Sequence, residues 1–276
     1  MIYLTTQTTA PASLQGENNL GDINLLRGDC LELMKDIPDG SIDMILADLP
    51  YGTTACKWDT IIPFGPLWKQ YNRIIKDNGA IVLTAGQPFT SALVMSNPKL
   101  FKYEWIWQKN STSGFALAKK QPMRNHESIL VFYKKQCTYN YIKEPRLMDE
   151  NSRKRMEYDF TSLKGNNQIN NGLKKVRYVP EDKKLSYPKT VHFFKNVANN
   201  SKQRVHPTQK PVELFEYLIK TYTNEGETVL DNCMGSGTTA IACMNANRNF
   251  IGFELDKEYF DVATKRIEEH EQQFEN

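Results

Sequence analysis

Short apolar runs alternate with longer amphipathic stretches along most of the chain. Runs of strand length, several apolar throughout, occupy residues 23–26, 42–47, 80–84, 103–107, 128–133, 228–230 and 250–253. Unbroken apolar character is typical of parallel strands that are covered on both faces. Helical periodicity occupies residues 65–76, 211–223, 238–247 and 257–273, with Pro211 expected at a first helical position. The alternation predicts an open α/β sheet of about seven strands, with ligands at the carboxyl ends of the strands.

Residues 139–204 interrupt this pattern with a basic, largely aperiodic stretch. They contain 15 Lys and Arg against 7 Asp and Glu, whereas the whole chain of 276 residues carries a formal net charge of only +3. Asn, Tyr and Phe are interleaved with the basic residues. This composition fits a solvated, partly disordered insert. It also fits a module that contacts a polyanion, with basic groups on phosphates and Asn or aromatic groups on bases.

The rest of the composition is ordinary for a globular protein. No run approaches the roughly 18 apolar residues of a membrane span. Residues 1–20 lack the basic start and apolar core of a signal peptide and are expected to form a polar tail. None of the 5 cysteines forms C-x-x-C, so neither a zinc site nor a disulfide framework is indicated. We therefore expect a cytoplasmic protein with reduced thiols, no metal and no membrane partner.

Two separate stretches place polar groups at predicted strand ends. The first is "DLPYG" at 48–52, which ends the buried run at 42–47. The second is "DNCMGSGTT" at 231–239, a glycine-rich loop between a strand and a helix, and Glu254 ends the next strand 23 residues after Asp231. Glycines allow close backbone approach to a ligand, and the acid is placed to accept hydrogen bonds from a ribose. The spacing predicts a nucleoside site, without separating NAD from other adenosine ligands.

These motifs together resemble the amino-group DNA methyltransferases that use S-adenosylmethionine. "DLPYG" is similar to the family's D-P-P-Y motif and "DNCMGSGTT" to its cofactor loop, while "HPTQKPVEL" at 206–214 and "RNHESILVFYK" at 124–134 also have the family's character. The catalytic motif precedes the cofactor loop, which is the family's β arrangement. The resemblance implies a Rossmann-like methyltransferase fold, with about seven mostly parallel strands and helices on both faces. It divides the chain into a tail (1–20), a catalytic half (21–138), a target-recognition insert (139–204) and a cofactor-binding half (205–276).

The resemblance also gives "DLPYG" a catalytic role. Asp48 and the carbonyl of Leu49 would accept hydrogen bonds from the target amine, Pro50 would keep Leu49 extended, and Tyr51 would stack on a flipped-out base. Leu49 stands where the family usually has Pro. Asp in the first position favours adenine N6 in duplex DNA, and cytosine N4 stays the alternative. A dinucleotide-binding oxidoreductase is a more remote alternative, because it leaves the catalytic motif and the basic insert without a role.

The remaining site residues follow from the same resemblance. For Asp29 the alternative is a helix N-cap, and for Thr208 and Lys210 it is a turn before the following helix. The expected cofactor contacts are Asp29, Cys30, Thr208, Lys210, Asp231, Gly235, Ser236, Gly237, Thr238 and Glu254. The expected DNA contacts are Arg153, Lys154, Arg155, Lys174, Lys175 and Arg177. A bacterial or phage restriction-modification context allows two further partners, a companion endonuclease and a second copy of the chain.

Overall fold

The computed structural model describes residues 2–5, 21–54, 59–145, 185–197 and 209–274. The chain divides into two compact units, one of Met1–Asn140 with Thr190–Asn276 and the other of Tyr141–Lys189. In the second unit, β7 (Glu144–Pro145) pairs antiparallel with β8 (Leu185–Ser186), and the rings of Tyr141 and Tyr187 meet edge to face at 5.1 Å. The domain boundaries expected from the sequence stay predictions.

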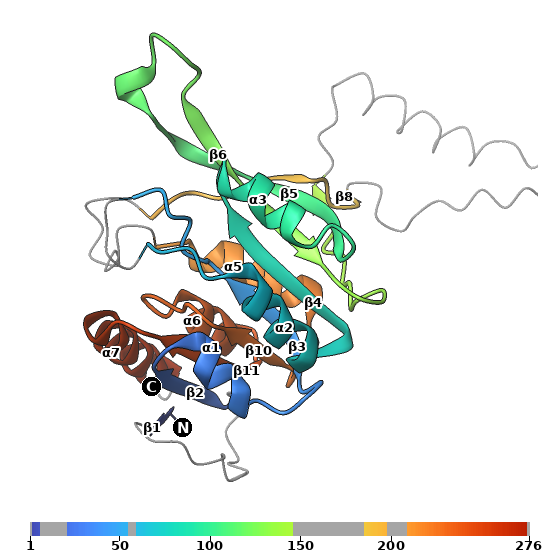
Figure 1. Cartoon of the computed structure of the whole chain (residues 1–276), viewed down its shortest axis with the longest axis vertical. Coiled ribbons are helices and arrows are strands. Elements are labelled where there is room, and N and C mark those ends of the chain that lie inside the picture. The colour runs from blue at the N-terminus through green and yellow to red at the C-terminus, as the bar shows by residue number, and fades with distance from the viewer. Residues whose placement is uncertain (1, 6–20, 55–58, 146–184, 198–208, 275–276) are drawn as a thin grey trace, which may run out of the picture. The chain divides into compact units, whose positions relative to one another are not determined.

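The first unit is built on one mixed sheet (Figure 1). Its strands lie in the order β1-β2-β11-β10-β3-β4-β6-β5-β9. All neighbouring pairs are parallel except those that involve β6, which runs antiparallel to β4 and to β5. The strands are β1 (Ile2–Thr5), β2 (Ile23–Arg27), β3 (Ile42–Ala47), β4 (Ile75–Ala85), β5 (Phe101–Ser113), β6 (Arg124–Phe132), β9 (Val191–Phe193), β10 (Thr228–Asp231) and β11 (Asn249–Glu254).

Helices cover both faces of this sheet. The α-helices of the unit are α1 (Cys30–Leu33), α2 (Phe64–Ile74), α3 (Phe89–Ser96), α5 (Val212–Tyr222), α6 (Thr238–Asn245) and α7 (Lys257–Phe274). Short 3-10 helices occupy Met34–Asp36 and Phe115–Leu117. None of the described helices combines the length and apolar character that crossing a membrane requires.

The alternation of side chains along β3 explains the two layers of core. Met44 and Leu46 pack with the apolar faces of α5, α6 and α7, whereas Ile45 and Ala47 pack with those of α2 and α3. All six residues of β3 are buried. Successive side chains on a strand point to opposite faces, so a central strand covered by helices on both sides is mostly apolar. The one polar residue of β3, Asp43, is buried and forms an ion pair with Lys76. Each buried Leu, Ile or Met contributes roughly 1.5–3 kcal/mol relative to exposure.

Two details of the sequence prediction were wrong. The described sheet has nine strands where about seven were expected, because β1 and β9 extend its two edges. β1 lies within the expected polar tail, and β9 lies within the expected insert but pairs with β5 of the main sheet. Pro211 is the N-cap of α5 and not its first residue, with an extended backbone ψ of 135°. An N-cap has non-helical backbone angles, so α5 begins at Val212.

The strand order brings two distant segments to one edge of the sheet. β3 lies between β10 and β4, and both neighbours run parallel to it. From β3 the chain winds to β4 on one side, and from β10 it winds to β11 on the other. Ligands in α/β sheets bind where the winding direction changes in this way, outside the carboxyl ends of the strands. The segments that follow β3 and β10 therefore lie side by side at this edge.

Candidate active site

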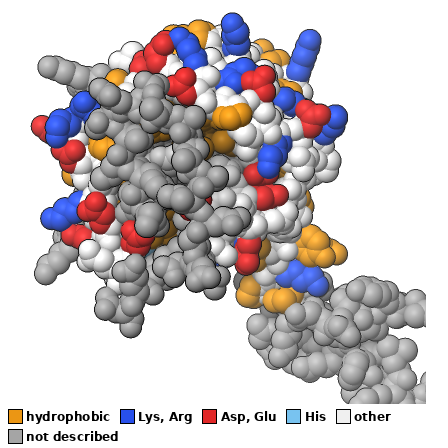
Figure 2. All heavy atoms as spheres, turned by 90° about the horizontal axis from the view of Figure 1, so that it is seen from below, with side chains coloured by type: hydrophobic (Ala, Val, Ile, Leu, Met, Phe, Trp, Pro, Cys, Tyr) orange, Lys and Arg blue, Asp and Glu red, His pale blue; other side chains and the backbone are white. Residues whose placement is uncertain are grey.

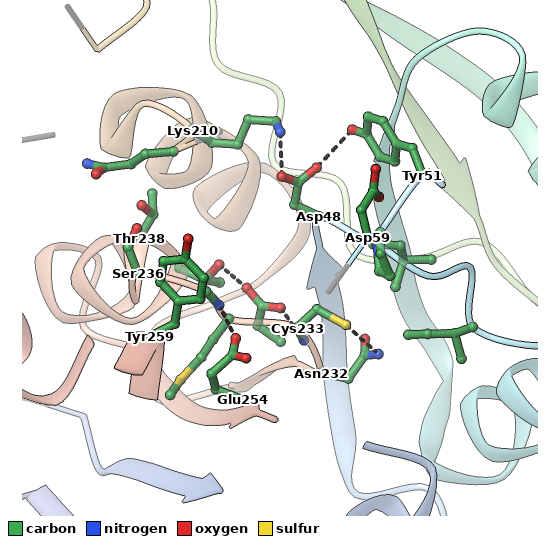
Figure 3. A pocket seen from close by; sticks show the side chains of 18 of the residues that line it. Asp48, Tyr51, Asp59, Lys210, Asn232, Cys233, Ser236, Thr238, Glu254 and Tyr259 are labelled. Carbon is green, nitrogen blue, oxygen red and sulfur yellow. Dashed lines mark hydrogen bonds and ion pairs between the residues drawn. The ribbon is translucent and has the colours of Figure 1, made fainter. Parts of the chain in front are cut away.

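A cavity of about 1100 Å³ lies at the carboxyl ends of β3, β10 and β11 (Figure 3). It is lined from one side by Asp48 and Tyr51, which follow β3, and from the other by Gly235 and Glu254. The structure thus brings together two motifs, at 48–52 and 231–239, that lie far apart in the sequence. Of the expected site residues, those that line it are Asp29, Cys30, Asp48, Leu49, Pro50, Tyr51, Lys210, Asp231, Gly235, Ser236, Thr238 and Glu254.

The carboxylate of Asp48 is held by three side chains. Nζ of Lys210 forms an ion pair with Oδ2, and the hydroxyl of Thr84, at the end of β4, donates to Oδ1. The hydroxyl of Tyr51 also donates to Oδ1, over 2.8 Å. A carboxylate offers about four acceptor positions, so this arrangement fixes the group and still leaves room for a further donor. Sequence reasoning identified Asp48 and Lys210 but not this contact between them.

Lys210 is shared between two carboxylates. Its side chain is 7% exposed, and Nζ lies 3.7 Å from Oε2 of Glu127 in β6 as well as against Asp48. The other oxygen of Glu127 is paired with Lys109 of β5. Burial lowers the pKa of Lys210, but the charges of Asp48 and Glu127 outweigh that effect and raise the pKa above its usual value. Lys210 is therefore a buried cation that depends on both acids.

Tyr51 presents its hydroxyl to Asp48 while its ring packs on the opposite side. The ring stacks on Phe89 of α3 with centroids 5.1 Å apart and planes 20° from parallel. Burial, followed by the charges of Asp48 and Glu127, raises the pKa of Tyr51 well above its usual value. Tyr51 consequently stays a neutral hydrogen-bond donor. The stacking on a flipped base that the sequence predicts for this ring stays a prediction.

The turn after Tyr51 is anchored by Asp59, which sequence reasoning did not select. One carboxylate oxygen accepts from the backbone N–H of Gly52 at 2.8 Å, and the other accepts from those of Thr53 and Thr54 at 2.9 and 2.7 Å. Burial acts to raise the pKa of Asp59, but hydrogen bonds from Thr54 and these backbone groups prevail and lower it. Gly52 has a φ of +67°, a left-handed conformation that favours glycine. Asp59 therefore shapes the chain that follows the catalytic motif.

The glycine loop after β10 is tied to the end of β11. The backbone N–H of Gly235 donates to Oε2 of Glu254 at 3.0 Å, and the N–H of Asp256 donates to Oε1 at 2.8 Å. Burial raises the pKa of Glu254. Apart from Gly235 and its two chain neighbours, no heavy atom of the described residues lies within 4 Å of the position that a Cβ on Gly235 would take. Glu254 thus lies beside open space, where a ligand hydroxyl can reach it.

The glycine loop is held in place by the buried acid Asp231 and by the half-buried side chain of Arg266. Thr239 and the backbone N–H of Cys233 donate to Asp231, and burial raises the pKa of Asp231 to about 7. Arg266 of α7 donates to the carbonyl of Ser236 at 2.9 Å and to the hydroxyl of Thr238 at 3.1 Å. Burial lowers the pKa of Arg266 to about 10. Ser236 and Thr238 are therefore positioned by α7, a contact that no local motif signals.

Asp29 takes the capping role that the sequence left open. Its Oδ1 accepts from the backbone N–H groups of Leu31 and Glu32 at 2.8 and 3.3 Å, which makes it the N-cap of α1. It lines the cavity as well, next to Cys30. A hydrogen bond from Cys233 lowers the pKa of the Cys30 thiol. The cofactor contacts predicted for Asp29 and Cys30 stay predictions.

Some predicted residues lie outside the described part of the chain. These are Thr208 and the six basic residues Arg153, Lys154, Arg155, Lys174, Lys175 and Arg177. Within the described ranges no cluster of His, Cys, Asp and Glu is arranged to hold a metal ion. Two of the missed residues carry a sequence signal in retrospect: Thr84 is the polar end of an apolar run, and Glu127 lies in the family-like stretch at 124–134.

The sheet, with its single antiparallel strand and paired motifs at one edge, defines a Rossmann-like fold with a nucleoside-type site. A family model described as DNA methylase (N6_N4_Mtase) matches residues 42–265, which is most of the chain. The protein belongs to this family, as its motifs predicted. The family assignment, the fold class and S-adenosylmethionine as the cofactor are thereby confirmed, and the oxidoreductase alternative is set aside.

Known proteins agree with this assignment. The chain is 30% identical to the type II methyltransferase M1.MboII of Moraxella bovis over 85% of its own length and 92% of the relative's. It is 28% identical to the DNA adenine methyltransferase YhdJ of Escherichia coli K12, over 88% and 82%. The M1.HpyAVI–SAM complex matches with 25% identity and a TM-score of 0.57, over 88% of this chain and 99% of that one. The cytosine-N4-specific PvuII DNA methyltransferase matches in fold alone, at 16% identity and a TM-score of 0.60 over 91% and 92%.

Proposed function

We propose that this DNA methyltransferase transfers the methyl group of S-adenosylmethionine to the exocyclic N6 of an adenine flipped out of duplex DNA. The observation that carries the proposal is the position of Asp48, whose carboxylate lies in the same cavity as Glu254 and the glycine loop. Asp in the first position of the motif favours adenine. Relatives of both kinds exist, one named an adenine methyltransferase and one cytosine-N4-specific, so cytosine N4 is the second candidate.

The residues of the cavity suit S-adenosylmethionine. Glu254 offers a carboxylate to the ribose hydroxyls, and the open space at Gly235 lets a ligand approach the backbone. Gly237 does not itself line the cavity; with a φ of +75° it is the N-cap of α6, between the lining residues Ser236 and Thr238. When bound, the cofactor supplies a methyl group activated by a positively charged sulfur. These residues would hold it, while Asp48 faces the target base.

The protein has to activate and orient the exocyclic amine of the target base, which is a weak nucleophile. The lone pair of an exocyclic amine is delocalised into the base, and hydrogen bonds from its two N–H groups to acceptors favour a tetrahedral nitrogen. Asp48 would accept one of them and the carbonyl of Leu49 the other. Positioning of this kind removes an entropic part of the barrier, and Asp48 also stabilises the positive charge that develops on the nitrogen. The same carboxylate is placed to accept the proton that the methylated amine releases.

The Leu at position 49 is compatible with this role. Its side chain is 3% exposed and packs in the core layer on the α2 and α3 side of the sheet. Core packing therefore restrains the backbone of Leu49, as proline does in most of the family. Pro50 adds a second restraint, because a residue before proline prefers an extended backbone.

DNA recognition is proposed for the insert, residues 139–204, most of which lies outside the described ranges. Figure 2 shows one face of the molecule, on which described Lys and Arg side chains are interspersed with Asp and Glu. That face offers no extended basic surface among the described residues. The basic surplus of the insert, 15 Lys and Arg against 7 Asp and Glu, favours it as the DNA-contacting region. A companion endonuclease and a homodimer stay predictions.

The experiment that tests the proposal is nucleoside analysis of methylated DNA. Mixed-sequence duplex DNA is incubated with the purified protein and S-adenosylmethionine, digested and analysed by mass spectrometry. We expect N6-methyldeoxyadenosine from the wild type and none from Asp48→Ala, whose cofactor affinity by calorimetry should be unchanged. If the product is N4-methyldeoxycytidine, the target is cytosine N4 and not adenine N6. Full activity of Asp48→Ala would show that Asp48 has no part in the mechanism.

A further inference from the structure

The buried ion pair between Lys210 and Asp48 raises a question about the reaction. Oδ1 of Asp48 accepts from the neutral donors Thr84 and Tyr51, so Oδ2 is the oxygen left for a target amine. Lys210 occupies that oxygen (Figure 3). An amine that gains positive charge during methyl transfer would meet an ammonium group on the same oxygen. Like charges this close oppose each other strongly in a partly buried site.

Glu127 is the group that can receive Lys210. Its Oε2 lies 3.7 Å from Nζ of Lys210, within ion-pair distance, and it is buried without a hydrogen-bond partner among the described residues. Lys109 holds the opposite oxygen of Glu127, so the carboxylate is fixed in place. A small movement of Nζ from Asp48 toward Oε2 would exchange one buried ion pair for another. Leaving the buried ammonium unpaired would instead be costly.

We infer that Glu127 is a positioning residue of the methyl transfer, because it takes over Lys210 when the target amine binds Asp48. This inference rests on the catalytic role proposed for Asp48. Before the base arrives, Lys210 holds the side chain of Asp48 in place. With the base bound, Glu127 keeps Lys210 paired and away from the nitrogen. The described groups that face Lys210 are Asp48 at the end of β3, Tyr51 in the following turn, with Nζ 5.8 Å from its ring centroid, and Glu127 of β6.

The test is Glu127→Gln, which keeps the shape of the side chain and removes its charge. At saturating cofactor and DNA we expect kcat to fall on the order of 10- to 100-fold, the equivalent of one charged hydrogen bond. Glu216→Gln is the matched control, because Glu216 pairs with Lys220 one turn further along α5 and does not line the cavity. The control should retain wild-type kcat.

Two further readouts separate this role from simple structural damage. Lys210→Met in the Glu127→Gln background should raise kcat at least threefold above the single variant, because no ammonium is then left on Asp48. Rising pH should also restore part of the activity of Glu127→Gln but not of the wild type, since Lys210 with one acid fewer loses its proton more easily. A wild-type kcat in Glu127→Gln, or a loss that neither change relieves, would overturn the inference.

If Glu127→Gln fails to fold, Glu127→Asp tests the same exchange with the charge kept. The shorter side chain withdraws the carboxylate from Nζ of Lys210, so kcat should fall, and Lys210→Met in that background should raise kcat again. A wild-type kcat in Glu127→Asp, or a loss that Lys210→Met does not relieve, would contradict the inference. Failure of this inference can be told apart from failure of the proposed function. An inactive wild type or an active Asp48→Ala variant would reject the proposed function. A wild-type kcat in Glu127→Gln would reject only the transfer of Lys210 from Asp48 to Glu127.

Discussion

Changing Asp59 to Asn should destabilise the turn that follows the catalytic motif. Asp59 accepts three backbone hydrogen bonds, from Gly52, Thr53 and Thr54, with two different oxygens. An amide has one acceptor oxygen, so Asn must turn an NH₂ group toward at least one of these N–H donors. Hydrogen bonds to a charged acceptor are worth roughly 1.5–3 kcal/mol each, and the loss of one or two gives about 2–4 kcal/mol after partial replacement by water.

Part of that cost falls on the fold and part on the position of Tyr51 and Asp48. We expect Asp59→Asn to lower the midpoint of thermal unfolding and to reduce kcat on the order of tenfold or more, because a displaced catalytic group loses orientation. Calorimetry should find cofactor affinity close to that of the wild type, since Glu254 and Gly235 are untouched. Asp261→Asn is the matched control, because Asp261 is exposed and pairs with Lys257 on α7.

The pKa of Asp59 adds a pH test. Because the folded-state pKa is lowered, the carboxylate contributes stability above its unfolded pKa, and this contribution is lost as the pH falls through the folded pKa. The difference in stability between the wild type and Asp59→Asn should therefore shrink under acid conditions. A variant with wild-type kcat and an unchanged unfolding midpoint at neutral pH would refute the anchoring role.

Three further predictions follow from the site and the insert. Glu254→Ala should weaken S-adenosylmethionine binding in calorimetry, and Gly237→Val more so, because Gly237 has a φ of +75° and its Cβ would lie 3.1 Å from a side-chain carbon of Ile267; unchanged binding would contradict both. Because the pKa of Asp231 is raised to about 7, the folded wild type holds this proton more tightly than the unfolded chain does. The unfolding free energy of the wild type should therefore decline by up to about 4 kcal/mol as the pH rises from about 4 to 7, and Asp231→Asn should remove this decline. Neutralising the basic cluster at 153–155 should lower DNA affinity and flatten its dependence on salt, and an equal salt slope would remove that cluster from the phosphates.

The strands in the centre of the sheet could be read from the sequence, and those at its edges could not. β3 and most of β4 are buried among apolar neighbours, so their own composition marks them. β9 has three residues with exposed Val191 and Phe193 on either side of a half-buried His192. Its conformation depends on pairing with β5, which a local pattern does not encode.

The residues of the site likewise divide into those that the sequence predicts and those that only the folded structure reveals. Asp48 and Glu254 were predicted because each ends an apolar run, and the end of a parallel strand is where a sheet binds ligands. The contact of Lys210 with Asp48 joins residues 162 positions apart in the chain, and no spacing rule relates them. Arg266 reaches the glycine loop from α7 for a similar reason, through the packing of a helix whose sequence pattern marks only an apolar face.

The antiparallel direction of β6 explains why the sequence does not predict Glu127 as a site residue. In a parallel sheet the site residues lie after the strands, so a residue that begins a strand is expected at the opposite edge. β6 runs antiparallel to β4, with Ser128 opposite Ala85 and Ile129 opposite Thr84. Its beginning therefore lies at the carboxyl edge of the parallel strands, and Glu127 reaches Lys210 there. A single reversed strand thus adds an acid to the catalytic edge, and the apolar run at 128–133 does not reveal the direction of that strand.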